Sequence, residues 1–281
     1  MKFRLLAGLA CMAAATAAAP AFAQEEPTGP VSVSGSVTLV SDYRFRGVSQ
    51  TDKELAIQGG ISVSHESGVY AGTWGSNLAG WGTFGGSNTE LDLFAGYAVE
   101  IASGTTLDVG LTWYMYPGGA DTTDFAEPYV KLSSSVGPAN VLVGVAYAPK
   151  QEALGRWYFT DDAYTAGLPD RPGAKSDNVY LWTDLSTAIP DTGLTLKGHL
   201  GYSNGNSGLG PNGTSIAPTG EYFDWLLGAD YALGPVTIGV SYVDTNISRS
   251  DYAYIADNFS STKNGSSIAG STVVFSLSAA F

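Results

Sequence analysis

Hydrophobic and polar residues alternate one by one along most of the chain. In residues 31–39, for example, the odd positions are Val, Gly or Leu and the even positions are Ser or Thr. Because successive side chains of a strand point to opposite faces, such a stretch is predicted to form a β-strand with one apolar and one polar face. Twelve stretches of this kind occur, at about residues 31–39, 57–64, 68–78, 90–99, 106–113, 125–135, 139–148, 177–188, 193–203, 221–232, 235–245 and 270–281.

The connections between these strands alternate strictly between long and short. A water-soluble β protein has no reason to place every long loop at one end, whereas outer-membrane barrels combine short periplasmic turns with long extracellular loops. Strands of about ten residues also suit a tilted crossing of a bilayer. The long connections lie at about 46–54, 76–89, 116–124, 149–176, 204–220 and 246–269, and the short ones at 66–68, 102–104, 137–138, 189–191 and 233–235.

The predicted fold is therefore all-β, a transmembrane antiparallel up-and-down β-barrel of about twelve strands. Backbone groups in hydrocarbon need partners, so the sheet must close and its first and last strands must pair. The larger apolar side chains are then expected to face lipid, and Ser, Thr, Gly and the acids to face the lumen. The pattern of residues 68–78 does not decide which side chains face which way. The chain ends in an alternating strand whose last residue, Phe281, resembles the signal that barrels present to their assembly machinery.

The first residues are predicted to be a targeting segment. A basic start is followed by an Ala-rich apolar run, and residues 21–23 form an A-x-A cleavage site. We expect cleavage between Ala23 and Gln24. The alternative, a lipoprotein signal at Cys11, would require cleavage after only ten residues. The predicted organisation is a signal peptide at 1–23, a short periplasmic segment at 24–30 and a barrel at 31–281.

Composition and charge narrow the function classes. The formal net charge is −13, and the predicted signal removes two bases, so nucleic acid and anionic membrane surfaces are poor partners. The only cysteine is Cys11, which argues against disulfides and thiolate metal sites in the mature protein. After the predicted signal the sequence contains no run of eighteen apolar residues, so no transmembrane helix is predicted. We expect no cofactor and no resident metal.

Residues 41–77 resemble a known family. The stretch Ser41-Asp42-Tyr43-Arg44-Phe45-Arg46-Gly47-Val48-Ser49-Gln50-Thr51, followed by 56–60 and by 65–77, is similar to the opening of the TorF family of porin-like proteobacterial proteins. The resemblance is dense there and looser through the later strands to the C-terminus. It implies an outer-membrane barrel but no particular substrate.

Charged residues on the inferred inner face are the candidate pore lining. Continuing the register of the first strand places Tyr43 and Phe45 on the lipid face near the outer rim, where aromatic girdles lie. The inner acids outnumber the inner bases, and this excess favours cations in an open bore. The excess would be cancelled by acid–base pairing, or by a one-residue shift in register that turns a strand's charges to the other face. The candidates are Asp42, Arg44, Arg46, Glu90, Asp92, Asp108, Glu127, Lys131, Asp184, Lys197, Asp224 and Asp230.

Other candidate sites are weaker. His65 falls beside a short turn and His199 points inward, so neither is placed for a Ser–His pair at the outer leaflet, and we expect no enzymatic activity. Loop acids such as Asp121, Asp124 and Asp161 lack the ordered spacing of a calcium site. The aromatic run 156–159 in the long 149–176 loop either folds inward as a plug or packs on neighbouring loops over the mouth, and the second arrangement is favoured slightly.

The sequence thus predicts a porin-like channel of the bacterial outer membrane that passes small polar solutes or ions, with a preference for cations. Its expected partners are outer-membrane lipid, the barrel assembly machinery and the diffusing solutes. One alternative is a filled barrel that acts structurally or adhesively through its loops, because Phe94, Tyr114, Tyr180 and Trp182 all fall on the inferred inner face. A second alternative is an outer-membrane enzyme.

Overall fold

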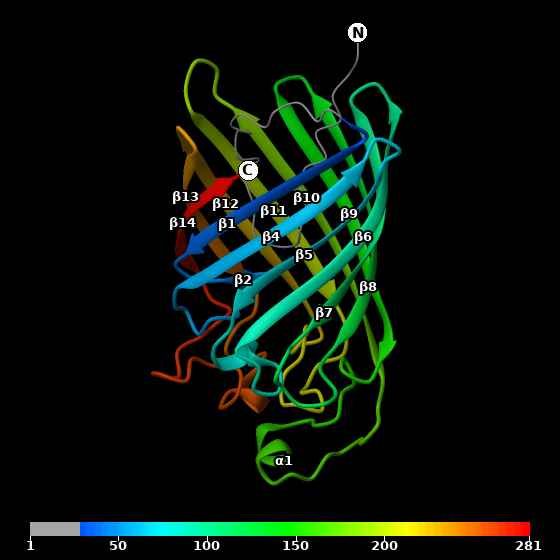
Figure 1. Cartoon of the computed structure of the whole chain (residues 1–281). Coiled ribbons are helices and arrows are strands. Elements are labelled where there is room, and N and C mark those ends of the chain that lie inside the picture. The colour runs from blue at the N-terminus through cyan, green and yellow to red at the C-terminus, as the bar shows by residue number, and fades with distance from the viewer. Residues whose placement is uncertain (1–28) are drawn as a thin grey trace.

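The computed structural model describes residues 29–281, so the predicted signal segment, its cleavage site and residues 24–28 lie outside the described part. Twelve antiparallel strands close into one barrel (Figure 1), which confirms the predicted fold. Each wall strand pairs with the wall strands that precede and follow it. They are β1 (Val31–Val40), β4 (Ala56–His65), β5 (Val69–Asn77), β6 (Thr89–Ala102), β7 (Thr105–Met115), β8 (Phe125–Val136), β9 (Ala139–Gln151), β10 (Ser176–Ala188), β11 (Leu194–Asn204), β12 (Glu221–Leu233), β13 (Val236–Thr245) and β14 (Thr272–Ala280).

The barrel is closed by pairing of β1 with β14, as predicted. Val37 lies opposite Ala279, and Leu39 lies opposite Leu277. Beyond the last paired strand residues, the Gly35 amide donates to the Phe281 carbonyl at 2.8 Å and the Phe281 amide donates back at 2.9 Å. A Cβ atom at Gly35 would lie only 2.6 Å from the Phe281 ring, so the glycine leaves room for this terminal side chain.

The two faces of the wall differ as the alternation predicts. On β7, Val109 and Trp113 are each 47% exposed on the outside, whereas the neighbouring Thr112 and Tyr114 are buried on the inside. The structure also decides the faces of β5. Val69 points outward, and Tyr70 points inward, where its hydroxyl contacts β7 and β8.

Short turns and long loops lie at opposite ends of the barrel (Figure 1). We call the corresponding parts of the lumen the inner half, next to the short turns, and the outer half, next to the long loops. The long loops hold a one-turn helix, α1 (Asp161–Thr165), and two 3-10 turns, η1 (Gly80–Thr83) and η2 (Ala253–Ile255). Within residues 29–281 no helix is long and apolar enough to cross a membrane.

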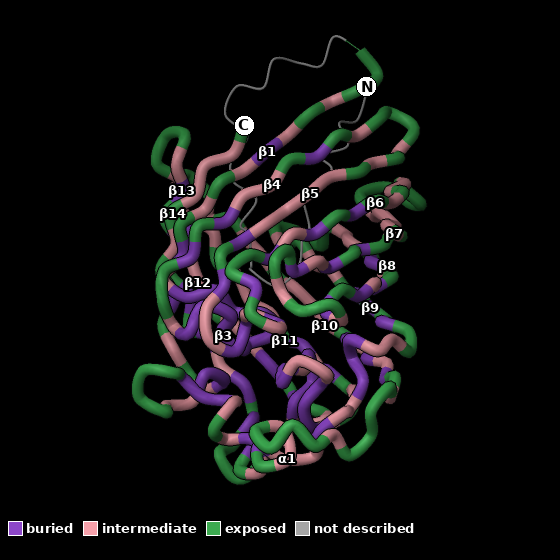
Figure 2. The backbone as a smooth tube through the Cα atoms, turned by 60° about the horizontal axis from the view of Figure 1, so that its bottom comes forward, coloured by how far each residue is buried: buried purple, intermediate pink, exposed green. Residues whose placement is uncertain are grey.

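One connection does not stay with the other loops. Residues 41–55, between β1 and β4, turn into the barrel and form a small hairpin from β2 (Arg44–Phe45) and β3 (Val48–Ser49). Figure 2 shows buried backbone gathered around β3 within the ring of wall strands. We call residues 41–55 the plug segment.

Candidate pore and the segment that fills it

Nine of the twelve predicted pore-lining residues stand on the inner face of the wall. Strands β6, β7, β8, β10, β11 and β12 carry them. The nine are Glu90, Asp92, Asp108, Glu127, Lys131, Asp184, Lys197, Asp224 and Asp230. The other three, Asp42, Arg44 and Arg46, are not on the wall, because they belong to the plug segment.

The predicted lipid-facing position of Tyr43 and Phe45 is wrong. The wall strand β1 ends at Val40, and both aromatic side chains are buried, at 3% and 8% exposure. Positive φ angles at Arg46 (48°) and Gly47 (79°) allow the two-residue turn that joins β2 to β3. A hairpin inside the barrel has the same period of two as a wall strand, so the alternation alone did not reveal that the chain had left the wall.

Arg46 at the tip of the hairpin reaches across the lumen. Its Nη2 atom donates to both carboxylate oxygens of Glu127 on β8, at 2.7 and 2.8 Å, and Nη1 donates to Asn178 on β10 at 2.7 Å. The guanidinium also lies 4.1 Å from the centre of the Tyr180 ring and 4.8 Å from that of Phe45. The Arg46 side chain is 0% exposed. This is a fully desolvated ion pair that fixes the plug segment to the wall opposite β1.

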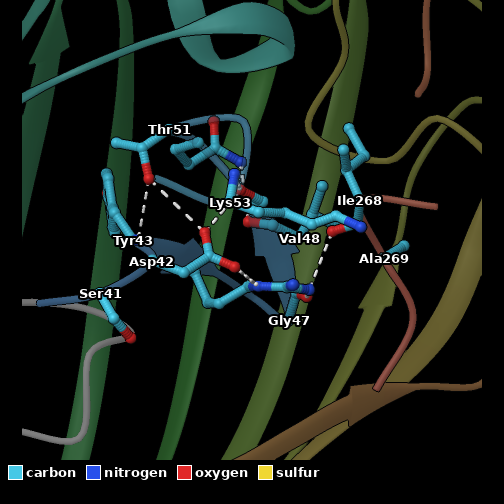
Figure 3. Close-up of polar contacts among 12 residues, drawn as sticks. Ser41, Asp42, Tyr43, Gly47, Val48, Thr51, Lys53, Ile268 and Ala269 are labelled. Carbon is cyan, nitrogen blue, oxygen red and sulfur yellow. Dashed lines mark hydrogen bonds and ion pairs between the residues drawn. The ribbon is translucent and has the colours of Figure 1, made fainter. Parts of the chain in front are cut away.

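The base of the hairpin is held by Asp42 and Arg44. The Arg44 Nε atom donates to Asp42 at 2.6 Å, and its Nη1 donates to the carbonyl of Ile268 in the last long loop at 2.9 Å. The second oxygen of Asp42 accepts from the Ser49 hydroxyl at 2.6 Å. Asp42 also lies next to the Thr51 hydroxyl, at 3.5 Å, so Thr51, Asp42 and the loop around Ile268 meet at the base of the hairpin (Figure 3).

The plug segment contacts further strands around the lumen. The Tyr43 hydroxyl lies 3.3 Å from Glu90 on β6, and its ring meets Trp74 on β5 edge-on at 5.5 Å. The Phe45 ring packs edge-on against Tyr114 on β7 at 6.0 Å. A Cβ atom at Gly47 would lie 2.3 Å from a methyl group of Thr245 on β13. The hairpin thus fills the outer half of the lumen and contacts the wall on several sides.

The last long loop clamps the plug segment. The Asp52 carboxylate accepts from the Thr262 hydroxyl, and Lys53 donates to Ser266 at 2.6 Å. Lys263 forms an exposed ion pair with Glu54. The residues before β4 and those before β14 meet because β1 stands between these two strands in the closed barrel.

An apolar cluster of long-loop residues covers the barrel mouth. Trp81 meets Phe259 edge-on at 4.7 Å, and Tyr158 meets Tyr164 in the same way at 5.2 Å. The 149–176 loop also packs on its neighbours, as favoured from the sequence, because Tyr158 forms a β-bridge with Leu209 of the 204–220 loop. The plug comes from residues 41–55 instead. In α1, Asp161 accepts from the Asp257 amide at 2.8 Å, and burial raises the pKa of the Asp161 carboxyl.

The inner half of the lumen is built differently, with tyrosine rings laid against the wall. Tyr70 of β5, Gly96 of β6, Gly110 of β7 and Tyr129 of β8 form one row across four strands. A Cβ atom at Gly96 would lie 2.4 Å from the Tyr70 hydroxyl, and one at Gly110 would lie 2.4 Å from the Tyr129 hydroxyl. The two hydroxyls meet at 2.6 Å over these glycines. The rings thus cover the wall instead of crossing the bore.

Three more inward aromatic side chains lie over a glycine of the adjacent strand. In each case a Cβ atom at the glycine would come within 2.4 Å of the aromatic side chain. These rings therefore lie close to the wall, which the sequence alone did not reveal. The pairs are Phe94 over Gly72, Trp182 over Gly144 and Tyr180 over Gly201.

Every base among the twelve candidates is paired with one of the acids. The wall pairs are Lys131 with Asp108, at 2.9 Å, and Lys197 with Asp230, at 2.8 Å, and the plug bases pair as described above. With eight acids and four bases, 8 − 4 = 4 acids are left without a Lys or Arg partner within residues 29–281. These four are Glu90, Asp92, Asp184 and Asp224.

Comparison with known proteins gives the chain a family. Residues 24–281 match a family described as a bacterial protein of unknown function, Gcw_chp. The chain belongs to the Gcw_chp family. No curated protein matches its sequence.

Two solved structures share the fold of this Gcw_chp barrel. One is the NanC porin in a rhombohedral crystal form, with a TM-score of 0.51 and 12% identity over 88% of this chain and 98% of that chain. The other is the KdgM porin in complex with disordered oligogalacturonate, with a TM-score of 0.50 and 8% identity over 89% of this chain and 98% of that chain. At these identities the similarity shows the fold alone.

His199 occupies a site on the inner wall of the Gcw_chp barrel. Its Nδ1 lies 2.6 Å from Asp184, and its Nε2 lies 3.1 Å from Asp224 and 2.9 Å from the Tyr180 hydroxyl. His65 is exposed beside a short turn and contacts Ser67. In the part of the chain that the structure describes, no three His, Cys, Asp or Glu side chains are grouped to hold a metal ion.

Proposed function

We propose that this protein is a porin-like channel of the bacterial outer membrane that passes small polar solutes and ions by diffusion. In the conformation described above, the plug segment holds the outer half of the lumen closed. The short-turn end would face the periplasm and the long loops would face outward, as in other barrels of this kind.

The observation that carries this proposal is the set of inward aromatic rings laid over glycines. A barrel that serves only as a scaffold gains stability by filling its lumen with wall side chains. Here four glycines, Gly72, Gly96, Gly110 and Gly144, let the inward rings of the inner half lie on the wall, and the outer half is filled by the plug segment, which is not part of the wall. A lumen that is kept clear at one end and closed by a hairpin at the other suits a channel that opens.

The acids that lack a Lys or Arg partner support a preference for cations. Glu90, Asp92, Asp184 and Asp224 have no Lys or Arg partner among the lumen bases. An excess of one sign in a low-dielectric bore raises the local concentration of counterions. We therefore propose that the open channel conducts K⁺ better than Cl⁻.

Location and biogenesis follow the same proposal. The exposed apolar outer face suits lipid contact, and the terminal Phe281 beside Gly35 offers a motif for the assembly machinery. Export would use the predicted signal peptide at 1–23. Membership of the TorF family remains a proposal based on the resemblance of residues 41–77.

A filled structural or adhesive barrel is the second candidate. It is favoured by the complete burial of Arg46 and by the apolar cluster over the mouth. An outer-membrane enzyme has less support, because the contact of His65 with Ser67 lies beside a short turn and His199 is held by Asp184 and Asp224.

Planar-bilayer recording in KCl separates the first two candidates. The wild-type barrel is compared with a variant in which residues 44–49 are replaced by Gly and Ser, and heat-dependent gel migration verifies the fold of both. The channel proposal predicts a low conductance for the wild type and a larger, steady conductance for the variant. If the folded variant also carries no current, the filled barrel is the better account.

A further inference from the structure

We infer that the inner half of the lumen binds oligosaccharides and that it favours amino sugars over neutral sugars and neutral sugars over acidic ones. This inference rests on the proposed channel function, because it names the class of solute that the channel would take. Three features carry it: aromatic rings laid along the wall, polar side chains beside them, and the sign of the residual charge.

The first feature is a pair of aromatic faces directed at the lumen. Tyr70 and Trp182 are half-buried on the inner wall, and each is backed by a glycine of the adjacent strand. A ring whose back lies on the wall presents its other, electron-rich face to the bore. The polarised C–H groups on one side of a sugar ring stack on such a face. Tyr129 is less available, because the Lys131 ammonium lies 4.3 Å from its ring centre.

The second feature is an accessible carboxylate next to one of these rings. Asp184 lies two residues after Trp182 on β10, so the two side chains share the inner face. The Asp184 side chain is 41% exposed, compared with 19% for Asp108 and 4% for Asp230. A carboxylate beside an aromatic ring accepts hydrogen bonds from sugar hydroxyls and also attracts an ammonium group.

The third feature is the local charge. Asp184 and Asp224 flank His199, so this group keeps at least one negative charge in excess even when His199 is protonated. The neighbouring wall charges do not offset it, because Lys131 and Lys197 are each paired with an acid. A uronic acid would be repelled here, whereas an ammonium would gain both from Asp184 and from the face of Trp182.

Calorimetry on the detergent-solubilised full chain tests the inference without requiring an open channel. The probes are a glucosamine hexamer, maltohexaose and a galacturonic acid hexamer, added at low ionic strength. We expect binding to weaken in that order. Trp182→Ala should raise the dissociation constant of the glucosamine hexamer about tenfold. Asp184→Asn should weaken the glucosamine hexamer far more than maltohexaose.

Matched controls come from the outer face of the same barrel. Trp113→Ala removes an outward tryptophan, and Asp177→Asn removes an outward acid from β10, so neither should change binding. Equal losses from Trp113→Ala and Trp182→Ala would overturn the inference, as would strongest binding of the acidic hexamer or no binding of any hexamer by correctly folded protein. KCl conductance is measured separately, so a conducting barrel that binds no sugar would refute the solute class and leave the channel intact.

Discussion

The outer and inner halves of the lumen are lined by the same twelve strands but are filled in different ways. In the outer half, inward side chains such as Tyr114 and Glu127 pack against the plug segment. In the inner half, inward rings such as Tyr70 and Trp182 lie against glycines of the adjacent strands. If the protein is the channel proposed above, closure therefore depends on the plug segment and not on the wall.

The contacts of the plug segment also differ with depth. Arg46 and Glu127 are fully buried and hydrogen-bonded, so separating them leaves a charge without water or partner. Lys263 and Glu54, at the clamp, are more than half exposed and lose little when separated. The closed state should therefore depend mainly on the hairpin tip.

The largest expected effect is that of Arg46→Ala. Removing one partner of a buried ion pair costs about 3–5 kcal/mol. Here this cost lowers the stability of the closed state, in which the plug segment is docked in the lumen. We expect the variant to conduct steadily in planar bilayers under conditions in which the wild type is mostly closed. Arg249→Ala, in the exposed part of the last long loop, is the control. An unchanged open probability in Arg46→Ala would show that Arg46 does not hold the plug segment in place.

The next largest effect concerns the wall that both halves share. Val109→Arg places a charge on the lipid face of β7 and should lower the free energy of unfolding in a bilayer by about 2–4 kcal/mol. Thr106→Arg, inward on the same strand, should cost much less because the lumen is polar. Asp108 is unsuitable for this comparison, since it is paired with Lys131. Equal penalties would mean that the outer face is not in lipid.

Glycines test whether the inner half is kept clear by design. Gly144→Ala would bring a Cβ within 2.3 Å of the Trp182 ring, and overpacking of this kind costs about 1–3 kcal/mol. The ring should swing into the bore and lower the conductance of the plug-replaced barrel. Gly198→Ala, whose nearest neighbour would be 3.6 Å away, should leave conductance unchanged. Equal effects from both substitutions would argue against a role of these glycines in keeping the rings on the wall.

A smaller effect is expected for ion selectivity. The plug-replaced barrel should show a reversal potential on the cation side in a KCl gradient, and Asp184→Asn should reduce it because that carboxylate is the most exposed of the lumen pairs. The preference should shrink as the Debye length falls from about 10 Å at 0.1 M to about 3 Å at 1 M salt. An anion preference at low salt would show that the bases govern the narrowest point.

The smallest effect should come from the clamp. Lys263→Ala removes an exposed ion pair with Glu54, and such pairs contribute about 0–1 kcal/mol. Open probability should rise slightly or not at all, and high salt should abolish any difference from the wild type. An increase as large as that of Arg46→Ala would mean that the clamp, and not the hairpin tip, holds the plug segment.

Most of the fold was predictable because it depends on local patterns. The period of two located all twelve wall strands to within a few residues, and the loop lengths separated the two ends. The plug segment was not located, because Tyr43 and Phe45 continue the alternation past the end of β1 at Val40. Gly47, with its positive φ angle, is the local signal of the hairpin turn.

The site was predictable only in part. The period of two placed the charged residues of the wall on its inner face, but their partners depend on how strands separated in sequence are aligned. No local pattern indicates that Arg46 meets Glu127, 81 residues away, or that Tyr70 and Tyr129 meet over two glycines. The pairing that leaves four acids without a Lys or Arg partner likewise follows from the closed barrel.

The central claim, that the plug segment closes an otherwise open lumen, is tested most directly by locking it in place. Cysteines at Gly47 and Thr245 are introduced with Arg46→Ala, because a Cβ atom at Gly47 would lie 2.3 Å from the Thr245 methyl group, close enough for a disulfide. The only native cysteine lies in the predicted signal segment. In planar bilayers the account predicts a small conductance when the disulfide is formed and a large one after reduction, reversibly in a single channel. The same conductance in both states, with the disulfide verified by mass spectrometry, would contradict it.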